Sequence, residues 1–214
     1  ITGLLDAWQD SLPCIFISGQ VNKMQTCANS KTELRQFGVQ EANIIEIVKS
    51  ITKYAVMINN PEKIAYHIDK ALHLAANGRP GPVWIDIPMD IQSAQIDPEN
   101  LERFIGKAPT YESSLEDFEN LFKKAERPIV LAGNGVRLSG AEKELQKFIE
   151  KHNIPMVATF MAVDLLPSSH PLNIGRVGIK GNRAANFAMQ NSDLLLSIGT
   201  RLSVPSTGYK YELF

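Results

Sequence analysis

The chain has 214 residues, of which 44% are hydrophobic, so it can build a core in one large or two small domains. Its 22 Lys and Arg residues nearly balance its 23 Asp and Glu residues, which argues against binding to nucleic acid or an anionic membrane through net charge. No apolar run approaches the roughly 20 residues that a transmembrane helix needs.

Two features of the sequence bear on whether the chain is part of a longer protein and on its cellular compartment. The first residues read as a helix already under way, with Leu4, Leu5 and Trp8 on one face and no capping residue before them, so we expect the chain to be part of a longer one. Cys14 and Cys27 are the only cysteines, and Cys14 falls in a predicted buried strand, where a free thiol behaves as a small hydrophobe. We therefore expect no disulfide and a cytoplasmic protein.

The first half of the chain alternates predicted strands and helices. The apolar run at residues 14–17 predicts a parallel strand covered on both faces. The polar stretch at residues 22–38 predicts a long loop, a length that is usually functional or disordered. We expect a helix at residues 41–51 and a strand at residues 54–58.

A helix with clear start and stop signals follows. Asn60 is the predicted N-cap, with Pro61 at the first helical position and Glu62 in the first turn. Gly78 supplies a left-handed cap at the other end. The predicted apolar stripe of this helix consists of Ile64, Ile68, Ala71, Leu72 and Ala75. A strand is expected at residues 83–87.

A change of composition at residues 91–111 predicts a linker. Beyond it, Ser113 or Ser114 is the expected cap of a new helix. The remaining expected elements are strands at residues 129–132, 156–158 and 194–198 and helices at residues 141–152 and 182–190. Repeated strand–helix units predict an α/β protein with two doubly wound, mainly parallel sheets and helices on both faces, with both lobes incomplete.

Glycine-rich loops follow strands in the second half. Gly133 and Gly135 come directly after a strand, where backbone amides can approach a phosphate. Leu138 stands where the dinucleotide fingerprint needs a third glycine, so a simple strand-to-helix turn remains an alternative. Gly178 and Gly181 flank Lys180 before another helix.

The side chains of Lys180 and Arg201 are candidates to face an anion in the same crevice, because ligands of open α/β sheets bind at strand carboxyl ends. A solvated surface lysine is the alternative for Lys180. The spacing of His, Cys, Asp and Glu residues predicts no metal site.

The order of these segments resembles the acetolactate synthase family of thiamine-diphosphate enzymes across nearly the whole chain. Residues 78–90 read G-R-P-G-P-V-W-I-D-I-P-M-D, close to a family pattern, and residues 37–41 (F-G-V-Q-E) take the place of the family's F-Q-E segment. The further matching segments are residues 10–21, 132–141, 154–157, 170–172, 178–181 and 193–201.

The resemblance implies a domain organisation. Residues 1–90 would be the C-terminal part of a pyrimidine-binding domain, residues 91–111 a linker, and residues 112–214 the N-terminal part of a central, nucleotide-binding-like domain. In the family, the glutamate that activates the cofactor and the motif that binds magnesium and the diphosphate lie outside the segment that this chain matches.

The resemblance also implies an activity. The full-length protein would be a transferase or lyase that decarboxylates a 2-keto acid and condenses the derived enamine with a second carbonyl compound, using thiamine diphosphate and Mg²⁺. Gln40 matches the family's active-site glutamine and is the candidate catalytic residue. A second copy of the chain would complete the site in a homodimer or tetramer, and the fragment alone is expected to be inactive.

Three departures from the family pattern bear on cofactor and substrate. Met89 replaces a lysine near the substrate channel, Lys180 replaces a histidine of the flavin site, and Ser203 replaces an aspartate. They argue against FAD and against strict acetolactate formation, and leave another 2-keto acid or an aldehyde as a competing substrate. The other classes considered are a non-catalytic nucleotide-binding or scaffold module and a Rossmann-type oxidoreductase, which Leu138 disfavours.

Overall fold

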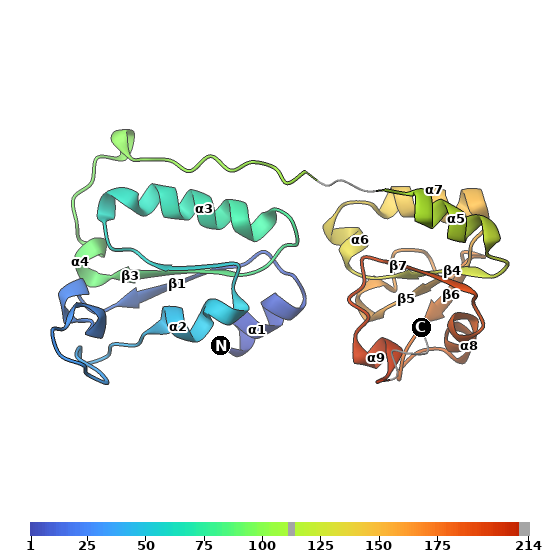
Figure 1. Cartoon of the computed structure of the whole chain (residues 1–214), viewed down its shortest axis with the longest axis horizontal. Helices are drawn as coiled ribbons and strands as arrows, with labels where there is room; N and C mark the ends of the chain where they lie inside the picture. The colour runs from blue at the N-terminus through green and yellow to red at the C-terminus, as the bar shows by residue number, and fades with distance from the viewer. Residues whose placement is uncertain (111–113, 210–214) are drawn as a thin grey trace. The chain divides into compact units, whose positions relative to one another are not determined.

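The structure is a computed structural model that describes residues 1–110 and 114–209. It divides into two compact units, Ile1–Tyr111 and Glu112–Phe214 (Figure 1). In each unit helices pack on a parallel sheet, so the predicted α/β class is confirmed. Among the described residues, no helix is both long and apolar enough to cross a membrane.

The first unit is built around a three-stranded sheet of order β1-β3-β2, in which both pairings are parallel. Short 3₁₀ turns interrupt the loop after β1 and flank several helices. The elements are α1 (Thr2–Gln9), β1 (Ile15–Gln20), α2 (Ile44–Val48), β2 (Tyr54–Met57), α3 (Ile64–Ala76), β3 (Val83–Pro88) and α4 (Met89–Gln92).

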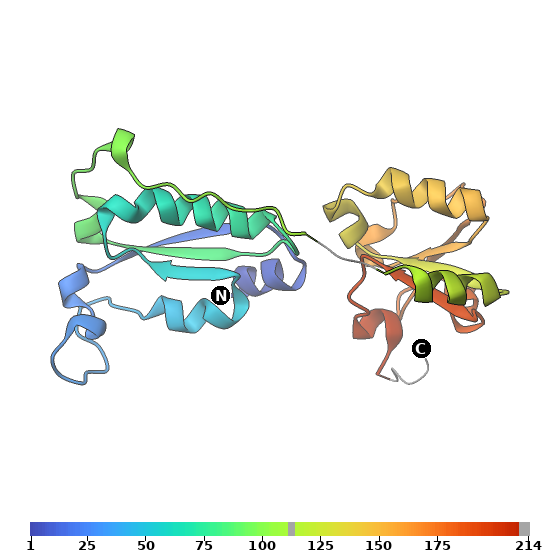
Figure 2. The same ribbon diagram turned by 45° about the horizontal axis from the view of Figure 1, so that its top comes forward.

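Helices cover both faces of this sheet, with α3 on one face and α1 and α2 on the other (Figures 1 and 2). Ala71 and Ala75 of α3 pack on Val83 and Ile85 of β3, where small residues let helix and sheet approach closely. The predicted start signal is present, since the Asn60 side chain accepts a hydrogen bond from the Glu62 amide. It opens a 3₁₀ turn that leads into α3.

Two expectations for the first unit are wrong. Strand β1 is not covered on both faces: it is an edge strand in the described sheet, and Ile17 is 65% exposed. The core beneath α3 is built from β2 and β3 and includes no residue of β1. In α3, Ile68 and Leu72 are exposed, so the buried stripe is narrower than predicted.

The second unit holds a four-stranded, all-parallel sheet of order β6-β5-β4-β7. Its chain direction across the sheet reverses between β4 and β7, which makes their carboxyl ends the topological switch point. The elements are α5 (Glu116–Lys124), β4 (Pro128–Ala132), α6 (Gly135–Leu138), α7 (Glu142–His152), β5 (Met156–Ala158), β6 (Asn173–Arg176), α8 (Arg183–Gln190), β7 (Leu194–Ile198) and α9 (Val204–Thr207).

Alternate residues of β4 enter two separate cores. Val130 and Ala132 point to the face covered by α7, where Leu145 and Ile149 pack. Ile129 and Leu131 point to the opposite face, where Ala185 of α8 packs. This continuous apolar pattern is what a parallel strand with helices on both sides requires.

Several local expectations for the second unit are not met. Strand β6 is absent from the expected elements. The helix expected at residues 182–190 is present as α8, but it begins without a side-chain cap, because Asn182 Oδ1 accepts a hydrogen bond from the Arg176 amide instead. Helix α5 starts after Leu115, so Ser114 is not its cap, and Ser113 lies outside the described residues.

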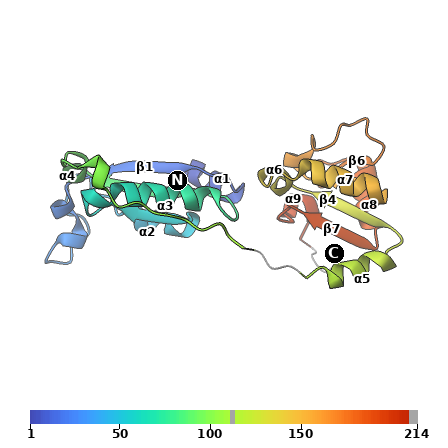
Figure 3. The ribbon, with the colours of Figure 1, turned by 90° about the horizontal axis from the view of Figure 1, so that it is seen from above.

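The first part of the predicted linker is attached to the first unit. Arg103 forms two hydrogen bonds with Asp69 of α3, and the Phe104 amide donates a third to the same carboxylate. The Phe104 ring packs edge-on against Tyr66. Figure 3 shows this segment running along α3.

Candidate functional site

The loop after β1 presents Gln40 at the tip of a turn. The Glu41 amide donates to the Gly38 carbonyl, which closes a turn whose two central residues are Val39 and Gln40. The Gln36 side-chain amide donates to the carbonyls of Gly38 and Val39 and supports the turn from outside. Both tip side chains are exposed, Val39 by 94%.

The carboxylate of Glu41 lies inside this loop. It accepts hydrogen bonds from the amides of Cys27, Phe37 and Gly38 and from the Cys27 thiol, whose sulfur is 3.2 Å from Oε2. Partial desolvation raises the pKa of Glu41, but these hydrogen bonds outweigh it, so the net pKa is lowered. Desolvation and the neighbouring Glu41 carboxylate raise the pKa of Cys27.

A buried carboxylate in β3 fastens the same loop to the sheet. Asp86 is 1% exposed and accepts hydrogen bonds from the hydroxyl of Ser18 and the side-chain amide of Gln20, both on β1. Gln20 also donates to the carbonyl of Ala42, the residue after Glu41. The turn that carries Gln40 is therefore held at the carboxyl end of β1.

In the second unit, three glycines bring the loops after β4 and β7 into backbone contact. The amides of Gly133 and Gly135 donate to the carbonyls of Ile198 and Gly199 at 2.9 and 2.8 Å. A Cβ on Gly133 would lie 2.3 Å from the Gly199 carbonyl oxygen. Only glycine allows this approach, so packing alone explains these residues.

The loop after β6 is closed in a similar way. Gly178 has a φ of +99°, and a Cβ there would lie 2.2 Å from the Pro205 carbonyl oxygen of α9. The Gly178 amide donates to the Asn186 side chain, and the Gly181 amide donates to the Gly178 carbonyl. Gly178 therefore packs on α9, whereas Gly181 packs on the backbone of its own loop, where a Cβ would lie 2.4 Å from the Arg176 carbonyl oxygen. Gly133 and Gly135 pack on the loop after β7.

These hydrogen bonds do not fit the predicted mode of flavin or nucleotide binding. A diphosphate needs backbone amides that are free to donate, and the amides of all four predicted glycines donate to protein acceptors. Lys180 and Arg201 are exposed, and their side chains form no hydrogen bond or ion pair with other described residues. They remain candidate anion ligands.

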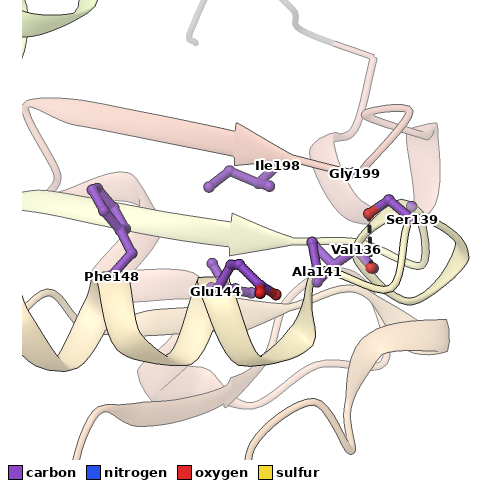
Figure 4. Close-up of a pocket in the computed structure, with 9 residues that line it drawn as sticks. Val136, Ser139, Ala141, Glu144, Phe148, Ile198 and Gly199 are labelled. Carbon is purple, nitrogen blue, oxygen red and sulfur yellow. Dashed lines mark hydrogen bonds between the residues drawn. The ribbon is translucent and has the colours of Figure 1, made fainter.

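A cavity of about 370 Å³ lies beside the switch point, between α7 and β7 (Figure 4). Of the six predicted cofactor-binding residues it contains Gly135 alone, so the structure does not bring the six into one cavity. The charged residue in its lining is Glu144, which does not suit an anionic diphosphate. The lining residues are Gly135, Val136, Ser139, Ala141, Glu144, Leu145, Phe148, Ile198 and Gly199.

Sequence reasoning missed an apolar surface at the carboxyl ends of β5 and β6. Phe160, Met161 and Ile179 are exposed there, and the guanidinium of Arg176 stacks over the Phe160 ring at 5.4 Å. No periodic pattern marks these residues, because Phe160 and Met161 lie in a single 3₁₀ turn and Ile179 lies in the loop between Gly178 and Gly181. Among the residues that the structure describes, no group of three His, Cys, Asp or Glu side chains could hold a metal ion.

Comparison with known families finds a match for the second unit. Residues 115–214 match the family described as "Thiamine pyrophosphate enzyme, central domain". This span covers the described second unit, including the sheet and its glycine loops. The second unit thus matches the central domain of thiamine pyrophosphate enzymes.

Individual relatives extend the match to both units. The chain is 36% identical to a probable acetolactate synthase large subunit of Methanocaldococcus jannaschii over 97% of its length, and 36% identical to the large subunit of Corynebacterium glutamicum, also over 97%. It is 34% identical to the isozyme 1 large subunit of Escherichia coli over 100% of the chain. The chain is thus similar to acetolactate synthase large subunits along nearly its whole length, and the predicted resemblance is confirmed.

The chain spans about a third of the curated relatives that it matches: 35%, 33% and 37% of the three proteins named above.

Proposed function

We propose that the protein of which this chain is part is a thiamine-diphosphate-dependent transferase or lyase that decarboxylates a 2-keto acid and joins the product to a second carbonyl compound. The observation that carries this proposal is the identity of about 35% with acetolactate synthase large subunits along nearly all of the chain. Two units with separate cores match together, which a shared fold alone would not explain.

The proposed role of this chain is to supply walls and polar groups to the site. Bound thiamine diphosphate would supply the electron sink that decarboxylation of a 2-keto acid requires. Gln40 fits this cofactor, because its amide can both donate and accept hydrogen bonds and it projects from a turn that the loop itself holds in place. We propose that Gln40 orients the substrate beside the cofactor.

The proposed domains, cofactors and partners rest on the same similarity to acetolactate synthases. We propose that residues 1–90 belong to a pyrimidine-binding domain, residues 91–111 are a linker, and residues 112–214 belong to a central domain. Mg²⁺ is expected to bind together with thiamine diphosphate. A second copy of the chain is expected to complete the site, and the protein is expected to be cytoplasmic. FAD is not expected, since the glycine-loop amides are occupied and Lys180 and Ser203 depart from the family pattern.

The test is an assay of the full-length protein with pyruvate, thiamine diphosphate and Mg²⁺. We expect release of carbon dioxide with formation of a carboligation product. Other 2-keto acids and aldehydes, offered as second substrates, would define the preference. The 214-residue chain alone should show no turnover, because the implied cofactor-activating groups lie outside it. Full-length protein that binds no thiamine diphosphate and consumes no 2-keto acid would refute the proposal.

A further inference from the structure

The most highly connected side chain in the loop after β1 is Glu41, which the proposed reaction does not use directly. Its two carboxylate oxygens receive three backbone amides and one thiol. The donors come from two stretches of the loop, Cys27 on one side and Phe37 with Gly38 on the other. A single carboxylate thus joins segments that are ten or more residues apart in the sequence.

These contacts hold the turn at residues 38–41 itself in place, in addition to the rest of the loop after β1. Phe37 and Gly38 enter the turn immediately before its tip, and Glu41 itself leaves the turn immediately after it. The carboxylate therefore ties both sides of the turn to each other and to Cys27. Since hydrogen bonds to a charged acceptor are stronger than neutral ones, this clamp outweighs each of the neutral contacts made by Gln36.

The position of Gly38 shows how closely the clamp is packed. Gly38 is buried, and a Cβ there would lie 2.9 Å from the Gln25 carbonyl oxygen and 2.8 Å from the Val21 side chain. The turn thus lies against the start of its own loop. The far end of the loop is held to the sheet, because the Gln20 side chain, which is hydrogen-bonded to Asp86, donates to the Ala42 carbonyl. In contrast, the side chains of Val39 and Gln40 extend into solvent.

From this arrangement we infer that Glu41 is a positioning residue for Gln40: its carboxylate holds the turn in the one conformation that directs Gln40 toward substrate. The inference rests on the proposed function, which gives Gln40 its task. Glu41 touches neither substrate nor cofactor in this role. It acts through the backbone of Phe37 and Gly38, and a Gln40 side chain on a loosened turn would sample many directions instead of one.

The experiment compares Glu41→Gln with the wild type in the full-length enzyme. The amide of the variant has the same size, but its NH₂ group would face backbone N–H donors, so part of the clamp is lost. The matched control is Glu33→Gln, which removes the same charge from an exposed position of the same loop. Gln36→Leu is a second variant that loosens the turn from outside, in case Glu41→Gln impairs folding.

Two readouts separate positioning from a general loss of structure. Hydrogen exchange should become at least about tenfold faster at the amides of Phe37 and Gly38 in Glu41→Gln, with β1 and β3 unchanged. The kcat for 2-keto acid turnover should fall about tenfold or more, with little change in KM. In a Gln40→Ala background, Glu41→Gln should lower kcat by less than about twofold, because the effects of two residues that act as a unit do not add.

The opposing outcomes are distinct. Unchanged exchange at Phe37 and Gly38, unchanged kcat in Glu41→Gln, or additive losses in the double variant would each overturn the inference. If the wild-type full-length enzyme shows no turnover at all, the proposed function fails and the positioning role fails with it. If Gln40→Ala is as active as the wild type while Glu41→Gln is impaired, Glu41 acts on something other than Gln40.

Discussion

At the scale of single residues, two glycines of the second unit differ in how closely neighbouring atoms surround the position that a Cβ would take. Gly199 has a φ of +63°, and a Cβ there would lie 2.4 Å from the Val136 amide nitrogen. Gly140 has nearly the same φ, +68°, but no atom lies within 4 Å of its Cβ position. Substituting alanine at the two positions therefore separates the free-energy cost of a left-handed backbone from the cost of a steric clash at the Cβ.

We expect Gly140→Ala to lower the free energy of unfolding by about 1 kcal/mol, the cost of a left-handed alanine. Gly199→Ala should lower it by that amount plus roughly 1–3 kcal/mol, because the backbone of the loop after β4 must move. Urea denaturation followed by circular dichroism measures both. Both tryptophans lie in the first unit, so their fluorescence transition should stay unchanged. Equal losses for the two variants would show that crowding at Gly199 is relieved without cost.

Asp193 provides a pH-dependent contact in the second unit. Its carboxylate accepts hydrogen bonds from the amides of Glu126 and Arg127, which tie the start of β4 to the start of β7. The hydrogen bond from the Glu126 amide is the largest influence on the pKa of Asp193 and lowers it. Desolvation, the next largest, raises this pKa, but the Arg127 amide and charge lower it further, so the net pKa is lowered.

A lowered pKa in the folded state means that Asp193 stabilises the fold above its ordinary pKa of 3.8, and that this contribution is lost as the pH falls through the lower, folded-state value. We therefore expect Asp193→Asn to be less stable than the wild type at pH 7, and we expect the difference to shrink as the pH falls below 3.8 and through the lowered folded-state pKa. Thermal unfolding across this range is the measurement. A difference that stays constant with pH would rule out the carboxylate charge as the cause.

At the scale of elements, the segment between the units is fastened over part of its length. Arg103 is held by Asp69, whereas Lys107 forms no ion pair with a described residue and Ile105 is 89% exposed. Proteases need several residues of mobile backbone, so the two basic residues should differ in susceptibility.

We expect trypsin to cleave after Lys107 faster than after Arg103 in the wild type. Asp69→Asn should increase cleavage after Arg103 and leave Lys107 unchanged, because it removes the charged partner of the guanidinium. Mass spectrometry of early digestion products gives both rates. Earlier cleavage at Lys70, inside α3, would contradict the described attachment.

The sequence predicted those elements whose local signals agree with their packing. Strands β5 and β7 have the predicted bounds: β5 is a fully buried apolar run, and three consecutive leucines mark the start of β7. Strand β6 escaped prediction because Asn173 and Gly175 disfavour a strand, and its pairing with β5 is irregular between Met156 and Val157. The exposure of Ile17 could not be foreseen, because it depends on where α3 lies over the sheet.

The candidate site was predictable only in outline. The segment that carries Gln40 was identified from the family resemblance of residues 37–41. Nothing in that pattern shows that Glu41 also accepts a hydrogen bond from the Cys27 amide, 14 residues away. For Gly133 and Gly135, a glycine that admits a phosphate and a glycine that admits a neighbouring loop look the same in a sequence. Three-dimensional contact with Gly199 distinguishes the two cases.

At the scale of the whole molecule, two units with separate cores share one chain, and the candidate groups lie at the carboxyl ends of the strands in both. Gln40 lies at this edge in the first unit, and Lys180 and Arg201 lie at it in the second. Open parallel sheets bind ligands at this edge, so the two units present comparable surfaces. The proposed partner copy and cofactor would add to these surfaces in the full-length protein.

The edge position of β1 has a practical consequence for handling the isolated chain. Its described backbone pairs with β3 on one side only, and residues 14–19 form an uncharged, proline-free stretch with Ile15 and Ile17 exposed. Such a stretch is a template for strand pairing between molecules, and pairing of this kind leads to aggregates. Colloidal stability of the 214-residue chain should therefore fall steeply with concentration, and a charged substitution at Ile17 should restore it.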